Sequence, residues 1–506
     1  MNTRTRQESK TKRLHPAGAL LSVLGVIVLS LGAASCHKTK RGHSKEANKE
    51  AGQAQPGHVQ SKCANRPRPR PRPERLPSVA RILPSWARSL KVMVKATVRQ
   101  TPDIHAPEMG EIKMVSRLPL LPYRPRGAGC NKFWLKLDEG AWLCGDDLRP
   151  DRREPLLKIQ PIMKPGHIIP GKYAWMRASG ASVFRSQDDV KANHPSGHLR
   201  GGTLVRWVKT YSIAGAPYWL ISKKVFVKAA ALLRFQVSKF HGVDMRAGHF
   251  KLPFCIVRAK TRGAAIYDKP GGREVSRVPH HSHWEILDKA KVGITKYYRI
   301  KPGWILARRV ISAWPSKPPP GVKECEKWIE IVVAQQSLVA YEGVEPVYMT
   351  MISSGDKRHP TKYGIFRIWW KKSQTDMTSG MAGNEFYHVD DVPWAQFFWR
   401  GQALHAAYWH NDFGNRRSHG CVNLSPMDAK WLYDWTEQPV PAGWLNRRMN
   451  AKAPGTIVRV RHKITHFPPF HGYARELAPP EAVRALDEAR RERMRQKSLR
   501  ILKTKK

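Results

Sequence analysis

Acidic side chains are scarce in this chain of 506 residues. Asp and Glu number 39 against 89 Lys and Arg, so the formal net charge is +50. An excess of this size attracts polyanions, which include nucleic acid, anionic lipid, and the carboxylates and phosphates of a cell envelope. Charge alone does not choose among these partners, so the choice depends on where the chain resides.

Long apolar runs are lacking as well, since none reaches the ~20 residues that span a bilayer as a helix. The most apolar stretch, residues 17–31, follows a basic flank in residues 1–16 and precedes small residues up to Cys36. This order predicts an export signal over residues 1–36. Residues 33–36 read AASC, which resembles the lipobox of bacterial lipoproteins and implies lipidation of Cys36. An uncleaved anchor and ordinary cleavage are the alternatives.

All three alternatives place the rest of the chain outside the cytoplasmic membrane. We therefore expect a protein of the periplasm or cell envelope, anchored to the membrane as a lipoprotein and attracted to anionic envelope polymers. Nucleic acid is not an expected partner.

Residues 37–85 contain four Arg-Pro pairs and no apolar periodicity. Because proline fixes φ and removes an amide donor, this composition predicts a disordered, extended, basic linker.

Three segments that follow the linker share one pattern, namely residues 86–150, 170–230 and 250–315. Each has short apolar runs separated by turn residues and ends in a related line, WLCGDDL, WLISKKV or WILARRV. Such strands predict a small β-barrel repeated about every 80 residues. The pattern resembles bacterial SH3-like domains, which implies wall-binding modules. In the first segment Cys130 and Cys144 flank an apolar strand, so an oxidising compartment favours a disulfide there, although sequence does not fix pairing.

Residues 405–424 read HAAYWHNDFGNRRSHGCVNL and carry the residue types of a thiol active site. A cysteine attacks as its thiolate, so it needs a neighbouring base to lower a resting pKa near ~8.5. His405 is the better base, because His419 directly precedes Gly420 and Cys421 and is held by its own backbone. Gly420 has no side chain, so the amides around it and Cys421 can converge on an oxyanion.

This segment resembles the L,D-transpeptidase catalytic domain family (YkuD type). The signature of the family is a histidine followed, after a dozen or more residues, by [S/T]-H-G-C and then Asn or Arg. The resemblance implies that Cys421 is the nucleophile and His405 the base. It also implies support of the oxyanion or contact with substrate for Ser418, His419, Gly420, Ala406, Tyr387 and Asn423.

Two of these assignments need comment. Ala406 stands where the family has glycine or serine, but the family uses the backbone carbonyl there, which alanine also supplies. Tyr387 lies eighteen residues before His405, where some members place a tyrosine beside the oxyanion; aromatic packing is the alternative.

Two other readings of the cysteine are open. In the first, Cys421 is a structural thiol or half of a disulfide. In the second it joins His405, His410 and His419 in a zinc site, although this is not a common zinc spacing. We expect no metal and no cofactor.

The fold class expected is mainly β, with tandem small SH3-like barrels followed by a β-sandwich-like catalytic domain with a few helices over residues 325–462. Ser425 and Pro426 predict a helix start, with Ala429, Leu432 and Trp435 as its buried stripe. The composition of residues 463–506 predicts a basic helical or disordered tail, and it favours a solvated helix over a surface-binding tail.

The function implied by the resemblance is peptidoglycan L,D-transpeptidation through a thioester at Cys421, with stem peptides as substrates. Two alternatives stay open. One is an L,D-carboxypeptidase or endopeptidase that uses the same cysteine and histidine. The other is a wall-binding scaffold lipoprotein without catalysis.

Overall fold

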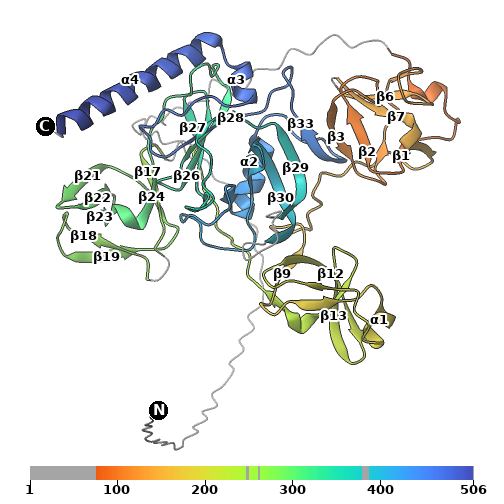
Figure 1. The fold of residues 1–506 in the computed structure, drawn as a ribbon, viewed down its shortest axis with the longest axis horizontal. Coiled ribbons are helices and arrows are strands. Elements are labelled where there is room, and N and C mark those ends of the chain that lie inside the picture. The colour runs from red at the N-terminus through yellow and green to blue at the C-terminus, as the bar shows by residue number, and fades with distance from the viewer. Residues whose placement is uncertain (1–75, 139, 247–249, 260–261, 379–386, 505–506) are drawn as a thin grey trace, which may run out of the picture. The chain divides into compact units, whose positions relative to one another are not determined.

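The computed structural model describes residues 76–138, 140–246, 250–259, 262–378 and 387–504 (Figure 1). These residues form a mainly β protein with few helices. The predicted export signal, its Cys36 and most of the predicted linker lie outside the described ranges. Within those ranges, no helix is both long and apolar enough to cross a bilayer.

The first β region contains two open sheets around one apolar core, which includes Leu90, Val98, Leu135 and Leu143. The core also includes Val79, so the region begins inside the stretch 37–85 expected to be linker. One sheet has the order β4-β1-β8, and the other runs through β3-β2-β7-β6-β5. The bounds are β1 (Ser89–Val92), β2 (Ala96–Arg99), β3 (Glu108–Ile112), β4 (Arg117–Leu118), β5 (Tyr123–Arg124), β6 (Trp134–Asp138), β7 (Ala141–Cys144) and β8 (Leu148–Asp151).

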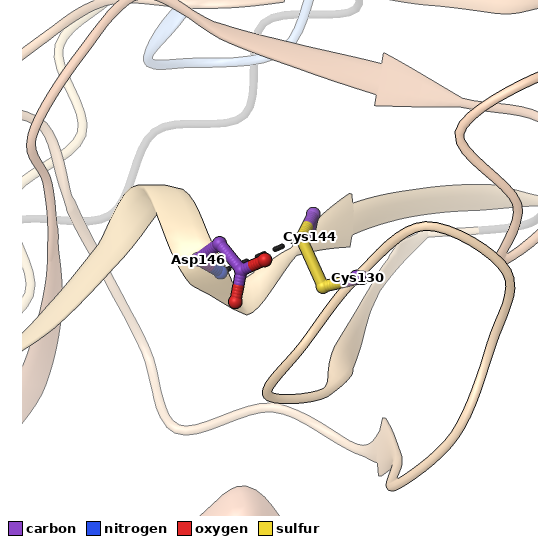
Figure 2. A group of neighbouring side chains, drawn as sticks. All are labelled: Cys130, Cys144 and Asp146. Atoms are coloured by element: carbon purple, nitrogen blue, oxygen red, sulfur yellow. Dashed lines mark hydrogen bonds between the residues drawn. A yellow bond between two sulfur atoms is a disulfide. The ribbon is translucent and has the colours of Figure 1, made fainter.

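A disulfide joins Cys130 to Cys144 at the end of β7 in this region (Figure 2). The Cys144 sulfur also accepts a hydrogen bond from the Asp146 amide at 3.4 Å. Cys325 is disulfide-bonded too. Among the described cysteines, Cys255 and Cys421 are free thiols.

The second and third β regions each have their own apolar core. The second contains β9 (Lys172–Met176), β10 (Ala181–Val183), α1 (Gln187–Lys191), β11 (Gly197–Leu199), β12 (Leu204–Ile213), β13 (Ala216–Ile221), β14 (Phe226–Lys228) and β15 (Leu232–Arg234). The third contains β17 (Phe254–Val257), β18 (Ala264–Tyr267), β19 (Glu274–Val278), β20 (His283–Glu285), β21 (Asp288–Val292), β22 (Thr295–Ile300), β23 (Gly303–Leu306) and β24 (Val310–Ala313).

The expected SH3-like barrels are not confirmed. In each of the three regions the strands divide between two open sheets, and no sheet closes on itself within the described residues. Two of the three tryptophans that begin the repeated lines, Trp142 and Trp219, are buried in their β regions. The repeated pattern therefore predicts small β units with a tryptophan near the last strands, but not how their sheets close.

The C-terminal β region is a sandwich of two sheets around one core. One sheet has the order β16-β27-β26-β25-β34-β28, and the other contains β33-β29-β30-β31-β32. Ile331 and Val458 of the first sheet and Leu404 and Val422 of the second lie in the same apolar cluster. The bounds are β16 (Val243–Asp244), β25 (Lys327–Val332), β26 (Ser337–Glu342), β27 (Glu345–Met351), β28 (Gly364–Arg367), β29 (Trp370–Thr378), β30 (His388–Trp399), β31 (Gln402–Ala406), β32 (Val422–Leu424), β33 (Trp444–Arg448) and β34 (Ile457–Arg461).

Helix α2 (Pro426–Trp435) follows β32 and confirms the predicted helix start. Ser425 caps it by accepting the Asp428 amide, and the expected stripe is buried. Figure 1 shows α2 beside β29 and β30. At the other end, the buried ammonium of Lys371 donates to the carbonyl oxygens of Tyr433 and Thr436, at 2.6 and 3.3 Å. These bonds satisfy carbonyls that a helix C-terminus leaves unpaired, so α2 is fixed at both ends.

A buried ionic network joins β25 to β34. Glu330 is 1% exposed and receives the guanidinium groups of Arg459 and Arg461, which are 7% and 5% exposed. Both guanidinium groups also donate to the Ser316 hydroxyl, at 2.7 and 2.6 Å. The carboxylate comes from β25 and the two guanidinium groups come from β34. A shift of one strand against the other would separate these charges, so the cluster fixes the register of the parallel pair.

Replacing Glu330 with glutamine should loosen these two strands. Glu330→Gln leaves two buried guanidinium groups without a counter-charge, and breaking a buried pair in this way costs about 3–5 kcal/mol. Hydrogen–deuterium exchange of the full chain should show faster exchange of the β25 and β34 amides. The control is Glu345→Gln on exposed β27 surface, which should leave exchange unchanged. Equal protection in the two variants would contradict the role given to Glu330.

The C-terminal segment packs on this sandwich through part of its length. Helix α3 (Tyr473–Leu477) buries Ala474, and α4 (Pro480–Thr504) buries Ala482, Val483 and Leu486. Ala474, Val483 and Leu486 lie in an apolar cluster that includes Trp328 and Ile365. The segment was expected to be a solvated helix or disordered. The difference arises because the three apolar residues at the start of α4 are spaced on one helical face, while the arginines that follow dominate its composition.

Candidate active site

The predicted nucleophile and base lie on adjacent parallel strands of the second sheet. Cys421 directly precedes β32, and His405 is the fourth residue of β31. The strand register pairs His405 with Asn423 and Leu404 with Val422. Extending this parallel register by one residue places Cys421 beside Ala403, two residues before His405 on the neighbouring strand.

The Cys421 sulfur is held by two backbone groups of the β30–β31 hairpin. The Ala403 amide donates to Sγ at 3.4 Å, and the thiol donates to the Gly401 carbonyl at 3.7 Å. Burial raises the pKa of the Cys421 thiol to about 11, against a smaller opposing effect of the Ala403 amide. The thiol is therefore protonated at neutral pH.

His405 is buried, with 2% of its surface exposed. Its Nδ1 lies 3.2 Å from the Ala406 carbonyl, and its ring stacks at 5.8 Å from that of Trp409. Burial lowers the pKa of His405 to about 4. The Ala406 carbonyl fixes the tautomer with the proton on Nδ1, so Nε2 carries a lone pair at neutral pH. The resting pair is thus a neutral imidazole and a neutral thiol.

The backbone around Gly420 is shaped by Ser418. Gly420 has φ +111°, and a Cβ at this position would lie 2.7 Å from the Gln402 Nε2 atom, so the turn requires glycine. The Gly420 amide donates to the Ser418 hydroxyl at 3.2 Å, and that hydroxyl donates to the Cys421 carbonyl. Because the Gly420 amide is engaged in this way, the Cys421 amide is the stronger candidate of the two for binding an oxyanion.

Three rings line the approach to this turn. The His419 ring lies 4.7 Å from Tyr387 and 4.6 Å from His359. Burial, and after it the electrostatic effect of Cys421 when that thiol ionises, raise the pKa of Tyr387 to about 12, so its hydroxyl keeps its proton at neutral pH. Nδ1 of His359 in turn lies 3.4 Å from the Asp356 carboxylate.

Asn423 faces His410 rather than the thiol. Its side-chain amide lies 3.1 Å from His410 Nε2, while its backbone exchanges hydrogen bonds with Ser353 at 2.9 Å in each direction. The four residues of the alternative zinc reading, His405, His410, His419 and Cys421, do not appear together in any group of described residues spaced for a metal ion.

Sequence reasoning missed Gln402, which ties the loop before β28 to the hairpin that holds the sulfur. Its Oε1 accepts the Lys362 amide at 2.9 Å, and its Nε2 donates to the Pro360 carbonyl at 3.3 Å. A single glutamine at the start of a strand belongs to no motif with a defined spacing, so the sequence does not mark it. His359 and Asp356 were missed for the same reason, because they come from a turn more than forty residues before the signature.

The family model for the L,D-transpeptidase catalytic domain (YkuD) matches residues 326–460. The protein YciB of Bacillus subtilis (strain 168), described provisionally as an L,D-transpeptidase, is 28% identical over 128 residues, which are 23% of this chain and 63% of that protein. The match thus spans less than two thirds of the relative.

Solved structures with similar segments include two L,D-transpeptidases. A mutant enzyme from Enterococcus faecium is 24% identical over 27% of this chain and 50% of its own, with a TM-score of 0.22. The enzyme from Mycobacterium smegmatis is 18% identical over 51% of this chain and 99% of its own, with a TM-score of 0.23. These TM-scores are too low to support a further conclusion. On the family match, residues 326–460 carry an L,D-transpeptidase catalytic domain of the YkuD type.

Proposed function

We propose that this protein is a cysteine-dependent peptidoglycan L,D-transpeptidase. The observation that carries the proposal is the pair of neutral groups, Cys421 directly before β32 and His405 two residues along the neighbouring parallel strand β31. The family match supports the substrate class that the resemblance implies, a stem tetrapeptide in which an amide joins the L-centre of a diamino acid to a terminal D-alanine. The chemistry needs neither metal nor cofactor, because a thiol and an imidazole split the exchange into two acyl transfers.

The first transfer forms the acyl-enzyme. His405 Nε2 takes the thiol proton as Cys421 Sγ attacks the scissile carbonyl, which forms the S–C bond and an oxyanion. The Cys421 amide and the Tyr387 hydroxyl are suited to stabilise that oxyanion, since both are donors beside the sulfur. The C–N bond then breaks, D-alanine leaves with the proton from His405, and a thioester remains. In the resting enzyme Sγ bonds to Gly401, so the thiol must rotate toward His405 when substrate binds.

The second transfer releases the enzyme. An amine of another stem attacks the thioester, His405 removes its proton, and the thiolate leaves and is reprotonated. Water as acceptor would give a tripeptide instead, which is the carboxypeptidase alternative.

The localisation follows as part of the same proposal: a membrane-anchored lipoprotein of the envelope, with the basic charge directed at anionic wall polymers. The export signal that supports it lies outside the described residues.

Product analysis tests the proposal and its hydrolytic alternative together. Full-length protein incubated with a disaccharide tetrapeptide should release D-alanine and yield a cross-linked dimer in excess over trimmed tripeptide. Tripeptide as the main product would replace the transpeptidase by a carboxypeptidase. Intact tetrapeptide after incubation with folded protein would favour the scaffold reading.

A further inference from the structure

A cavity of about 580 Å³ lies between α3 and α4, outside the site described above. Its lining combines three arginines with one carboxylate and an apolar wall: Arg475, Arg490, Arg491, Asp487, Phe470 and Met494. Asp487 lies 3.5 Å from both Arg475 and Arg490, and all three side chains are at least 32% exposed. Three positive charges and one negative leave the cavity with a surplus of two.

The surroundings do not cancel this surplus. Burial lowers the pKa of His471, which lines the cavity, and the positive charges of Lys362, Arg490 and Arg475 lower it further. The same holds for neighbouring His466, on which burial, His462 and Arg490 act in the same direction. The positive charges that act on these two histidines would also stabilise an anion placed in the cavity.

The cavity adjoins the hairpin that holds the catalytic sulfur. The His471 ring lies 5.2 Å from Trp399, the last residue of β30, and the Gly401 carbonyl two residues later contacts Cys421 Sγ. Lys362, whose charge reaches His471, donates its amide to Gln402 in the same hairpin. A ligand in the cavity would therefore lie along the hairpin that borders the thiol.

We propose that this cavity is an accessory site for a carboxylate-bearing stem peptide of peptidoglycan, adjacent to the stem that reacts at Cys421. The inference rests on the proposed function, because that function supplies the polymer. Arginines bind carboxylates through paired N–H donors. Asp487 matches the free amine of a diamino acid, and the apolar wall matches an alanine methyl group. A phosphodiester chain would offer Asp487 no cation, so the mixed lining favours a peptide.

The test uses a stem tripeptide, which lacks the terminal D-alanine and therefore cannot acylate the enzyme. Its affinity for the full-length protein is measured by calorimetry. The double variant Arg490→Gln/Arg491→Gln should weaken binding by about tenfold or more, as expected for lost charge-assisted hydrogen bonds. The matched control is Arg484→Gln/Arg495→Gln, which removes the same charge from exposed positions of α4 that do not line the cavity. It should change affinity less than about twofold.

Three outcomes would overturn the inference. The first is equal weakening in both double variants, which would mean general charge attraction. The second is unchanged binding in the cavity variant. In the third, inorganic phosphate depends on Arg490 and Arg491 for binding and the tripeptide does not, which would identify a phosphate polymer instead.

Measuring D-alanine release from tetrapeptide on the same proteins separates this inference from the proposed function. A wild-type protein that releases none would contradict the function. Tripeptide binding that ignores the two arginines would contradict only the accessory site.

Discussion

His405→Gln is expected to slow acylation of Cys421 by about 10²–10⁴-fold, the range for loss of a positioned general base. The reason is the burial of both partners, which holds the thiol pKa at about 11 and the imidazole pKa at about 4. Without His405 the thiol loses the base assigned to it, and a thiol with this pKa ionises too rarely at pH 7 to replace that base. Single-turnover release of D-alanine measures the effect. His167→Gln, at an exposed position, is the control.

The same two pKa values set the pH dependence of acylation. The reactive form needs His405 neutral, which holds above about pH 4, and Cys421 protonated, which holds below about pH 11. The acylation rate should therefore be flat across neutral pH. It should fall toward acid as His405 gains a proton, and toward strong base as Cys421 loses the proton that His405 passes to the departing D-alanine. A rate that climbs tenfold per unit from pH 6 to pH 8 would instead indicate a thiol that titrates alone.

Cys421→Ala is expected to abolish D-alanine release, because alanine offers no atom that can form an acyl bond. A matched control exists in the second free thiol. Cys255 is fully buried in β17, and burial raises the pKa of its thiol to about 12. Cys255→Ala should therefore keep D-alanine release at the wild-type level, provided that the chain folds. Loss of release in both variants with retained folding would contradict the assignment of the nucleophile.

The sequence predicts those parts of the molecule that depend on local chemistry. The start of α2 could be predicted because Ser425 and Pro426 act within one turn, and the β-rich run from residue 325 could be predicted because strands require branched and aromatic side chains. The family signature placed Cys421 and His405 in one segment, and the strand register shows how that segment brings them together, with Cys421 beside Ala403 on the strand that carries His405.

The parts that sequence did not predict depend on contacts between distant segments. Gln402 acts through Pro360 and Lys362, some forty residues away, and no periodicity marks such a contact. The engagement of the Gly420 amide by Ser418 is local, but it depends on the path of one turn, which residue types alone do not specify. The packing of α4 on the sandwich could not be predicted, because its three buried residues stand in a helix that is otherwise rich in arginine. Sheet closure in the three upstream regions likewise depends on pairing that tryptophan spacing does not specify.

Intact-protein mass spectrometry tests the central claim most directly. Full-length protein is mixed with a disaccharide tetrapeptide and quenched in acid, alongside Cys421→Ala and Cys255→Ala. The thioester account predicts a mass gain equal to the donor minus D-alanine in the wild type and in Cys255→Ala, and none in Cys421→Ala. An adduct that persists in Cys421→Ala, or no adduct in any folded protein while D-alanine is released, would contradict covalent catalysis at Cys421.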